Sequence, residues 1–190
     1  MVLTEAQREA RQGRVGASEA AALPLINEHP FMDAAELYDR VVLGAEREVN
    51  QRMLVGQYLE PAILDLLRRI YHLHPLACAR AYVHPVLPAS CSPDAYLPPD
   101  GLVEVKVTSA WAADRPRYVE WQVQQQLWLT RRAYAQVAVL TGSQLQLHLV
   151  ERDDDMIGQL TEALEQFQAD HLVPRIRPAA KPLIFQAKRS

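Results

Sequence analysis

The residues whose types and spacing could do chemistry lie between positions 92 and 106. The segment Ser92-Pro93-Asp94 contributes one carboxylate, and the segment Val103-Glu104-Val105-Lys106 begins nine residues after that aspartate. Residues two apart in an extended strand point to the same face, so Glu104 and Lys106 are expected to project together. If Asp94 lies on the neighbouring strand of a hairpin, its carboxylate comes beside that of Glu104. Two carboxylates with a nearby backbone carbonyl form an all-oxygen site suited to Mg²⁺ or Mn²⁺.

Lys106 would complete a hydrolytic site beside such a metal ion. Its amine could orient or deprotonate an attacking water, or stabilise the charge that develops on phosphorus. Phosphodiester cleavage needs a Lewis acid on the phosphate and a nucleophilic water held in line. Each segment alone is more typical of a Pro-Asp turn or of the solvated face of a strand. Their spacing across one hairpin strengthens the catalytic interpretation, and both interpretations stay open at this point.

The helices that must position these residues are predicted from caps and periodicity. Capping boxes predict helices that begin at Thr4 and at Asp33, and a short helix is expected to begin at Ser18. Apolar spacing predicts a helix from Glu48 to Tyr71, with a break or kink at Pro61. The helix from Thr4 is expected to end near Gly13, and the helix from Asp33 to end at Gly44. The remaining predicted helices cover residues 116–130 and 153–172.

Short segments rich in β-formers lie between these helices. The predicted strands cover residues 81–87, 91–97, 101–107, 135–140 and 145–150, separated by turns rich in Pro and Gly. Helices, then strands, a helix, strands and a final helix indicate an α/β or α+β domain with a mixed central β-sheet flanked by helices.

Bulk composition is that of an ordinary globular chain. Its 190 residues are 49% hydrophobic and 23% charged, with a formal net charge of −3. We expect one domain over residues 1–190, with a catalytic core at about 11–172 and a basic, Pro-containing tail at 174–190. No apolar run approaches the roughly 20 residues of a membrane helix, so no membrane association is expected. Two cysteines without a framework favour a reducing cytoplasm.

Several motifs together resemble one group of nucleases. The pattern Pro-Asp followed by Glu-x-Lys is similar to the PD-(D/E)xK superfamily. Further segments are similar to its phage lambda exonuclease and YqaJ-type alkaline exonuclease branch, and they occur in that branch's order over roughly residues 11–155. The matching segments are residues 11–18, 56–60, 91–94, 101–106, 122–132 and 149–153. The resemblance implies a restriction-endonuclease-like core.

The resemblance also implies roles for single residues. Asp94 and Glu104 would be the main metal ligands, completed by the Val105 carbonyl, and Lys106 would be the catalytic lysine. Glu60 would contact a metal ion directly or through water. Gln122 would help to position the nucleophile and the lysine, with Gln124 as the second choice. Without the resemblance, the glutamines could simply coat a helix.

Residues that would hold a terminal 5′ phosphate are also implied. Arg11, Ser18 and Ser92 stand where the branch has this pocket, and a guanidinium with hydroxyl donors suits a phosphate. Arg11 could instead be a solvated residue at a helix end, and Ser18 only an N-cap. The branch's basic position soon after the lysine is Ala110 or Trp111 here, and Arg115 or Arg117 would substitute for it.

The function that follows from the resemblance is a Mg²⁺-dependent 5′→3′ exonuclease on double-stranded DNA ends, with Mn²⁺ as a possible substitute. It would leave a 3′ single-stranded tail for recombination, in a bacterial or phage-infected cytoplasm. The resemblance further implies a homotrimeric ring and a single-strand-annealing partner protein. The alternatives are an endonuclease of the same superfamily, of restriction or repair type, and a DNA-end-binding protein without catalysis.

Overall fold

The computed structural model describes residues 9–45, 49–109 and 116–180. Its larger sheet has five strands in the order β2-β5-β6-β7-β8. Strands β6 and β7 run parallel, and the other neighbours run antiparallel, so the sheet is mixed as predicted. The strands are β2 (Leu76–Ala77), β5 (Ala95–Leu97), β6 (Gly101–Thr108), β7 (Tyr134–Thr141) and β8 (Gln144–Glu151).

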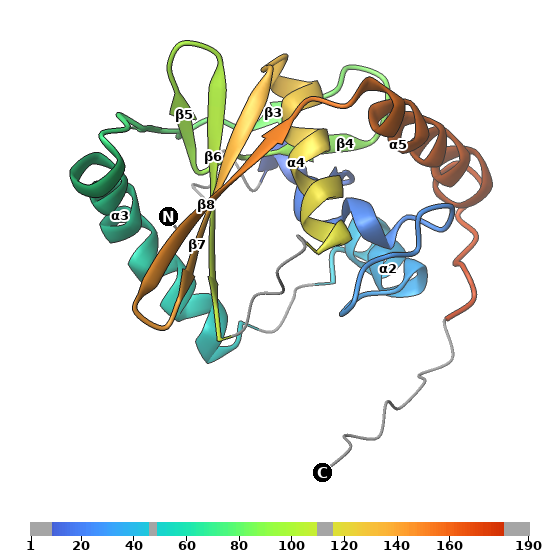
Figure 1. Cartoon of the computed structure of the whole chain (residues 1–190). Helices are drawn as coiled ribbons and strands as arrows, with labels where there is room; N and C mark the ends of the chain where they lie inside the picture. Colours follow the sequence, from blue (N-terminus) through green and yellow to red (C-terminus); the bar gives the residue numbers. More distant parts are fainter. Residues whose placement is uncertain (1–8, 46–48, 110–115, 181–190) are drawn as a thin grey trace.

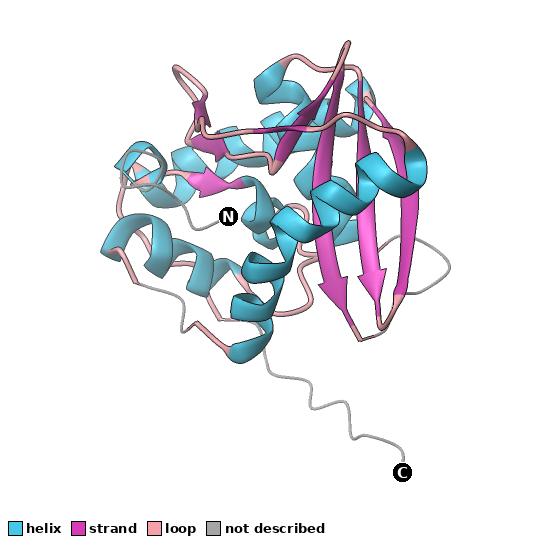
Figure 2. Ribbon diagram, turned by 90° about the vertical axis from the view of Figure 1, so that its left-hand side faces the viewer, coloured by secondary structure: helices cyan, strands magenta, loops and turns pink. Residues whose placement is uncertain are grey.

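Two helices cover opposite faces of this sheet (Figure 1). Helix α3 (Gln51–Tyr71) packs on one face, through a cluster that contains Ile63, Leu67 and Val103. Helix α4 (Arg117–Thr130) packs on the other face, through a cluster that contains Val123 and Leu102. Because side chains alternate along β6, the even-numbered residues after Leu102 also face α4. Figure 2 shows the three long strands from the side that α3 covers.

The other helices form a second core beside the sheet. They are α2 (Ala34–Leu43) and α5 (Asp154–Phe167), followed by the π-helical turn η2 (Gln168–Leu172). Asp33 and Asp153 cap α2 and α5 by accepting hydrogen bonds from backbone N–H groups in the first turn. The amphipathic faces of these helices bury Leu37, Leu164 and Phe167 in one cluster with part of α4.

A small sheet lies under α4 and carries the N-terminal part of the site. It consists of β1 (Val15–Gly16), β4 (Ala89–Cys91) and β3 (Tyr82–Val83), in the order β1-β4-β3. The buried side chain of Gln125 donates to the carbonyls of Val15 and Ser90, at 2.9 Å each, so α4 holds β1 and β4 together. The 3₁₀ helix η1 (Ala17–Ala22) follows β1 directly.

Most predicted elements are confirmed, with some differences. Helix α3 continues through Pro61, so a break there is wrong, and the kink given as the alternative stays a prediction; Pro61 is exposed, and the packed residues Ile63 and Leu67 hold the following turns. The expected strand at 91–97 is two strands, because β4 pairs within the small sheet and β5 within the large one. The strand expected at 81–87 shrinks to β3.

Some predictions fall outside the described residues. These are the helix start at Thr4, the start at Glu48, and the tail beyond residue 180. The end of the first helix is described, because residues 9–11 are helical and residues 12–13 form a turn. The helix expected at Ser18 begins one residue earlier and is 3₁₀ rather than α. In the part of the chain that the structure describes, no helix is long and apolar enough to cross a membrane.

Candidate active site

The β5–β6 hairpin brings two carboxylates together. Ala95 pairs with Val103 in the antiparallel register, which puts Asp94 opposite Glu104 just before β5 begins. Asp94 Oδ2 accepts a hydrogen bond of 2.7 Å from the backbone N–H of Val105. This geometry is the one predicted from strand alternation and hairpin pairing.

Glu104 is the most enclosed carboxylate of the pair, with 4% of its surface exposed. Its Oε1 accepts from Lys106 Nζ at 2.7 Å and from Gln122 Nε2 at 2.5 Å. Its Oε2 accepts from Gln126 Nε2 at 2.7 Å. Lys106 Nζ also donates to Gln122 Oε1 at 2.7 Å, so carboxylate, ammonium and amide form one closed network.

Two glutamines of α4 therefore reach the site, and only Gln122 was predicted from the sequence. Gln122 and Gln126 are four residues apart, so both lie on the helix face that packs over β6. Gln126 was missed, although its spacing from Gln122 was the signal that could have found it. The two glutamines between them point elsewhere, since Gln125 binds the small sheet and Gln124 binds the end of β8 and the start of α5.

Electrostatics in the network shift two pKa values upward. Burial, reinforced by the charges of Glu104 and Glu60, raises the pKa of Asp94 well above its ordinary value, against the opposing effect of the Val105 N–H. Burial alone would lower the pKa of Lys106, but the Glu104 carboxylate outweighs it, with help from Asp94 and the Tyr118 phenol. Lys106 is therefore an ammonium ion at neutral pH. It lies beside two carboxylates, whose combined negative charge exceeds its single positive charge.

Glu60 lies near the carboxylate of Asp94. It lies in α3, is 8% exposed, and is close enough to Asp94 to contribute to its raised pKa. Glu60 thus adds a third carboxylate near the hairpin pair, without completing a three-ligand group with Asp94 and Glu104 among the described residues.

A cavity of about 310 Å³ opens beside Asp94 and Glu104 and joins them to three predicted phosphate-binding residues. Arg11, Ser18 and Ser92 line it together with Gln122 and Gln126. Ser92 Oγ is buried and has no hydrogen-bond partner in the part of the chain that the structure describes. A buried hydroxyl without a partner costs free energy, and a bound oxyanion at this wall would remove that cost.

Two arginines and a glutamate form the N-terminal wall of the cavity. Glu19 is 6% exposed; it accepts a 2.8 Å hydrogen bond from Gly16 N and an ion pair of 2.9 Å from Arg40. Arg11 lies directly over Gly16, because a Cβ at position 16 would stand 2.5 Å from Arg11 Nη2. Gly16, not Ser18, is the N-cap of η1, so the Ser18 hydroxyl is not used as an N-cap.

The donor set fits a hard divalent cation in part. Asp94 and Glu104 offer carboxylate oxygens, and a bound cation would oppose the burial and the neighbouring carboxylates that raise the pKa of Asp94. Gln126 Oε1 is buried and has no hydrogen-bond partner among the described residues, which adds an unused oxygen beside this pair. Within residues 9–45, 49–109 and 116–180, however, no three acidic, His or Cys side chains are close enough to form a complete ligand group. Lys106, Gln122 and Gln126 occupy the oxygens of Glu104 instead.

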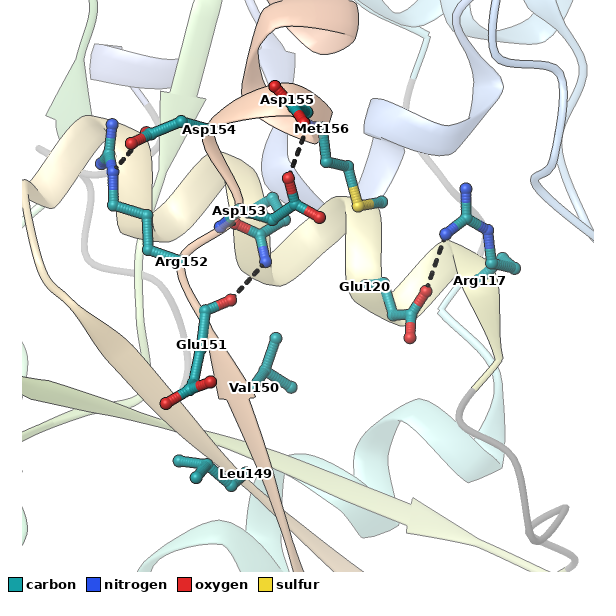
Figure 3. A pocket seen from close by; sticks show the side chains of 11 residues that line it. Arg117, Glu120, Leu149, Val150, Glu151, Arg152, Asp153, Asp154, Asp155 and Met156 are labelled. Carbon is teal, nitrogen blue, oxygen red and sulfur yellow. Dashed lines mark hydrogen bonds and ion pairs between the residues drawn. The ribbon is translucent and has the colours of Figure 1, made fainter.

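Two predicted DNA-contacting residues lie elsewhere. The Gln124 side chain donates to the carbonyl of Glu151 and accepts from Asp153 N, so it joins α4 to the start of α5. Arg117 pairs with Glu120 and Glu28 on the surface. Both line a separate cavity of about 670 Å³ at the end of β8 (Figure 3). Arg115 lies outside the described residues, as do Ala110 and Trp111.

Comparison with solved structures identifies the fold. An alkaline exonuclease from Laribacter hongkongensis superposes with a TM-score of 0.73 and 23% sequence identity, over 88% of this chain and 92% of that chain. A structure of that exonuclease in complex with dAMP gives a TM-score of 0.74. A phage-related exonuclease from Haemophilus somnus 129PT gives 0.69 at 14% identity, over 85% of this chain and 95% of that chain.

These similarities show that the chain shares the fold of these exonucleases, a mixed sheet flanked by helices. The neighbours are of the kind that the sequence motifs resemble, alkaline and phage-related exonucleases. No protein-family model matches the sequence, and no curated protein matches it. At this level of identity the likeness concerns the fold, and the site must be argued from its own geometry.

Proposed function

We propose that this protein is a metal-dependent nuclease that degrades double-stranded DNA from a 5′ end. The observation that carries the proposal is one cavity that unites Asp94 and Glu104 with Arg11 and the unpartnered Ser92 hydroxyl. Asp94 and Glu104 supply oxygen ligands, and Lys106 supplies an ammonium group beside them. Arg11 and Ser92 supply donors for a phosphate. The exonuclease fold supports the same conclusion.

Asp94, Glu104 and the Val105 carbonyl would hold a Mg²⁺ ion, with Mn²⁺ as a substitute and Glu60 in reach directly or through water. When bound, the ion would polarise the phosphate and lower the pKa of a water molecule. Binding would also offset the burial and the neighbouring carboxylate charges that raise the pKa of Asp94. To receive the ion, Glu104 would exchange at least one of its present hydrogen bonds for a metal contact.

Lys106 and Gln122 would act on the water and on the developing charge. Lys106 Nζ is already an ammonium held by Glu104 and Gln122, so it suits the stabilisation of a phosphorane-like negative charge rather than removal of a proton. Gln122 has its amide nitrogen on Glu104 and its amide oxygen on Lys106, which fixes both of them relative to one another. Gln122 is thus a positioning residue in this arrangement.

The predicted phosphate-binding residues would select the DNA end. A terminal 5′ phosphate carries more negative charge than an internal phosphodiester, and a guanidinium with hydroxyl donors can match it. Arg11, Ser18 and Ser92 provide this chemistry in the same cavity that Asp94 and Glu104 line. A strand held by its terminal phosphate would present a phosphodiester bond to the carboxylate pair, which gives 5′→3′ polarity.

By resemblance alone, the working form would be a homotrimeric ring around DNA, and a single-strand-annealing protein would take up the 3′ tail in the cytoplasm. A ring would allow processive digestion with a net charge of only −3, since threading replaces charge attraction. Native mass in solution tests the ring directly, and a monomeric mass at working concentration would contradict it.

The deciding experiment is digestion of linear duplexes that carry a 5′ phosphate at one end, at both ends or at neither. We expect Mg²⁺-dependent release of nucleotides from phosphorylated 5′ ends, and none in chelator. Covalently closed circular DNA should remain intact. Cleavage of the circle would instead identify an endonuclease. Stable DNA-end binding without metal-dependent turnover would overturn catalysis altogether.

A further inference from the structure

Three aromatic rings form a cluster on the surface at the start of α4. Phe31 and Tyr118 pack edge to face, with ring centroids 6.3 Å apart. His29 lies 6.2 Å from Phe31 and 5.9 Å from Tyr118. Phe31 is 70% exposed, although it is a large apolar side chain. These three residues are called the aromatic cluster below.

The loop that carries Phe31 is held firmly. The backbone N–H groups of Glu28 and His29 both donate to the carbonyl of Ala21, at 2.8 and 3.0 Å. The Glu28 carboxylate accepts from Trp121 Nε1 at 2.7 Å and from Arg117, which ties the loop to α4. The exposure of Phe31 is therefore not due to fraying of a loose loop, because the loop is held at several points.

The aromatic cluster borders the candidate active site. Tyr118, Gln122 and Gln126 are spaced by four residues, so they form one row along the face of α4 that covers β6. The tyrosine end of this row lies near Lys106, whose pKa the Tyr118 phenol helps to raise. Met32, the neighbour of Phe31, lines the cavity that contains Asp94 and Glu104. The chain thus passes from the cavity wall to the exposed ring within one residue.

We propose that Phe31, backed edge to face by Tyr118, stacks against a nucleobase of the DNA strand whose phosphate lies at Lys106. This inference rests on the nuclease function proposed above and adds the contact that holds the base beside the cleaved bond. Tyr118 stands four residues before Gln122, about 6 Å along the axis of α4. That spacing suits a base attached to the sugar next to a phosphate at the network of Glu104 and Lys106.

The site chemistry favours a base over a protein partner as the occupant. Every base has a π-face, so stacking on aromatic rings is independent of sequence, as a degrading enzyme requires. A fixed ring beside a phosphate-binding cavity serves a nucleotide, which has an anionic part and a flat apolar part. The matching surface for a protein partner would be a broad apolar patch, whereas Arg117 and Glu28 flank this one.

The test is equilibrium binding of the full-length protein in chelator to 5′-phosphorylated duplexes, either intact or with one abasic site at the first, second or third nucleotide. The variants are Phe31→Leu, which keeps apolar bulk without the ring, and Phe31→Tyr, which keeps the ring. Phe31 is mostly exposed, so both variants should fold. Metal-dependent digestion of the intact duplex by the unaltered protein is measured in parallel.

We expect Phe31→Leu to weaken binding to the intact duplex by on the order of 10-fold, and Phe31→Tyr to leave it unchanged. On the duplex whose abasic site removes the stacked base, Phe31→Leu should have no further effect. An equal loss on intact and all abasic duplexes, or no loss at all, would overturn the proposal. A change in native mass without a base-dependent loss would identify a protein interface instead. Digestion that fails while base-dependent binding persists would overturn the nuclease function and leave the stacking contact standing.

Discussion

Helix α4 contributes glutamines to two cavities that differ in how their charges are compensated. At the end of β8, Arg117 pairs with Glu120 and Arg152 pairs with Asp154 (Figure 3). Both polar ends of the Gln124 amide are hydrogen-bonded there. Beside β6, the carboxylates of Asp94 and Glu104 are crowded together, and the buried oxygens Ser92 Oγ and Gln126 Oε1 have no hydrogen-bond partner among the described residues. The first cavity is the larger, at about 670 Å³ against about 310 Å³.

The difference shows that size is a poor guide to function in this chain. A cavity whose two arginines are both paired and whose acidic groups are mostly exposed to solvent has little to gain from a ligand. The smaller cavity holds the buried carboxylates of Asp94 and Glu104, together with Arg11 and the Ser92 hydroxyl. It gains from binding a cation and a phosphate together. The predictions below change one cavity at a time.

Replacing Lys106 should have the largest effect on activity. Lys106→Ala removes the ammonium group that stabilises charge at Glu104 and at the phosphate, and we expect kcat to fall by about 10²- to 10⁴-fold. DNA binding should survive, because the predicted phosphate-binding residues are untouched. Digestion rates under saturating Mg²⁺ measure the effect, and a variant with full activity would remove Lys106 from the site.

Replacing Gln126 or Gln124 should have different effects, because the two side chains serve different cavities. Gln126→Ala deletes a hydrogen bond to the buried Glu104 carboxylate, and we expect a loss of activity of about 10-fold or more, since such bonds to charged groups contribute roughly 1.5–3 kcal/mol. Gln124→Ala is the matched control from the same helix. It should reduce the free energy of unfolding by about 1 kcal/mol while leaving the rate per folded molecule unchanged. Equal activity losses in both variants would contradict the distinction.

A methyl group at position 16 should disturb the phosphate side alone. Gly16 has φ −70°, so alanine fits the backbone, but its Cβ would displace Arg11 Nη2 from its present place. We expect a loss of several-fold in the preference for a 5′ phosphate over a 5′ hydroxyl, with little change in metal dependence. The ratio of digestion rates on the two ends measures it. An unchanged ratio would show that Arg11 does not read the terminal phosphate.

Asp94→Asn should stabilise the metal-free protein in a pH-dependent manner. The folded-state pKa of Asp94 is raised, so its unfolded form ionises first as the pH rises above about 4. The unaltered protein then loses stability relative to the variant, until the pH passes the folded-state pKa. Thermal unfolding in chelator should thus show equal Tm values at low pH and a higher Tm for Asp94→Asn at neutral pH. A lower Tm at neutral pH would contradict the electrostatic crowding.

The strand part of the site could be predicted from sequence, because alternation and hairpin pairing are local rules. They place Glu104 and Lys106 on one face and Asp94 opposite, as observed. The helix part needs the rotation of α4 about its axis, which is set by packing against β6 and the small sheet. For that reason Gln126 was missed, and Gln124, two residues from Gln122, was chosen although it faces away.

Local rules also failed where tertiary packing was stronger. The break predicted at Pro61 is absent, because the residues after it are buried against the sheet and the proline itself faces solvent. A proline costs a helix about 3 kcal/mol, which the burial of a few large apolar side chains can offset. The strand predicted across Ser92 is divided for a related reason, since its two halves find partners in different sheets.

Direct metal binding tests the central distinction between the two cavities. Mn²⁺ would be titrated calorimetrically into the unaltered protein, into Asp94→Asn, and into Asp154→Asn, which removes an exposed carboxylate from the cavity at the end of β8. We predict that the unaltered protein and Asp154→Asn bind Mn²⁺ alike, and that Asp94→Asn loses the binding. Normal binding by Asp94→Asn, or loss of binding in Asp154→Asn, would contradict the assignment of the metal to the site of Asp94 and Glu104.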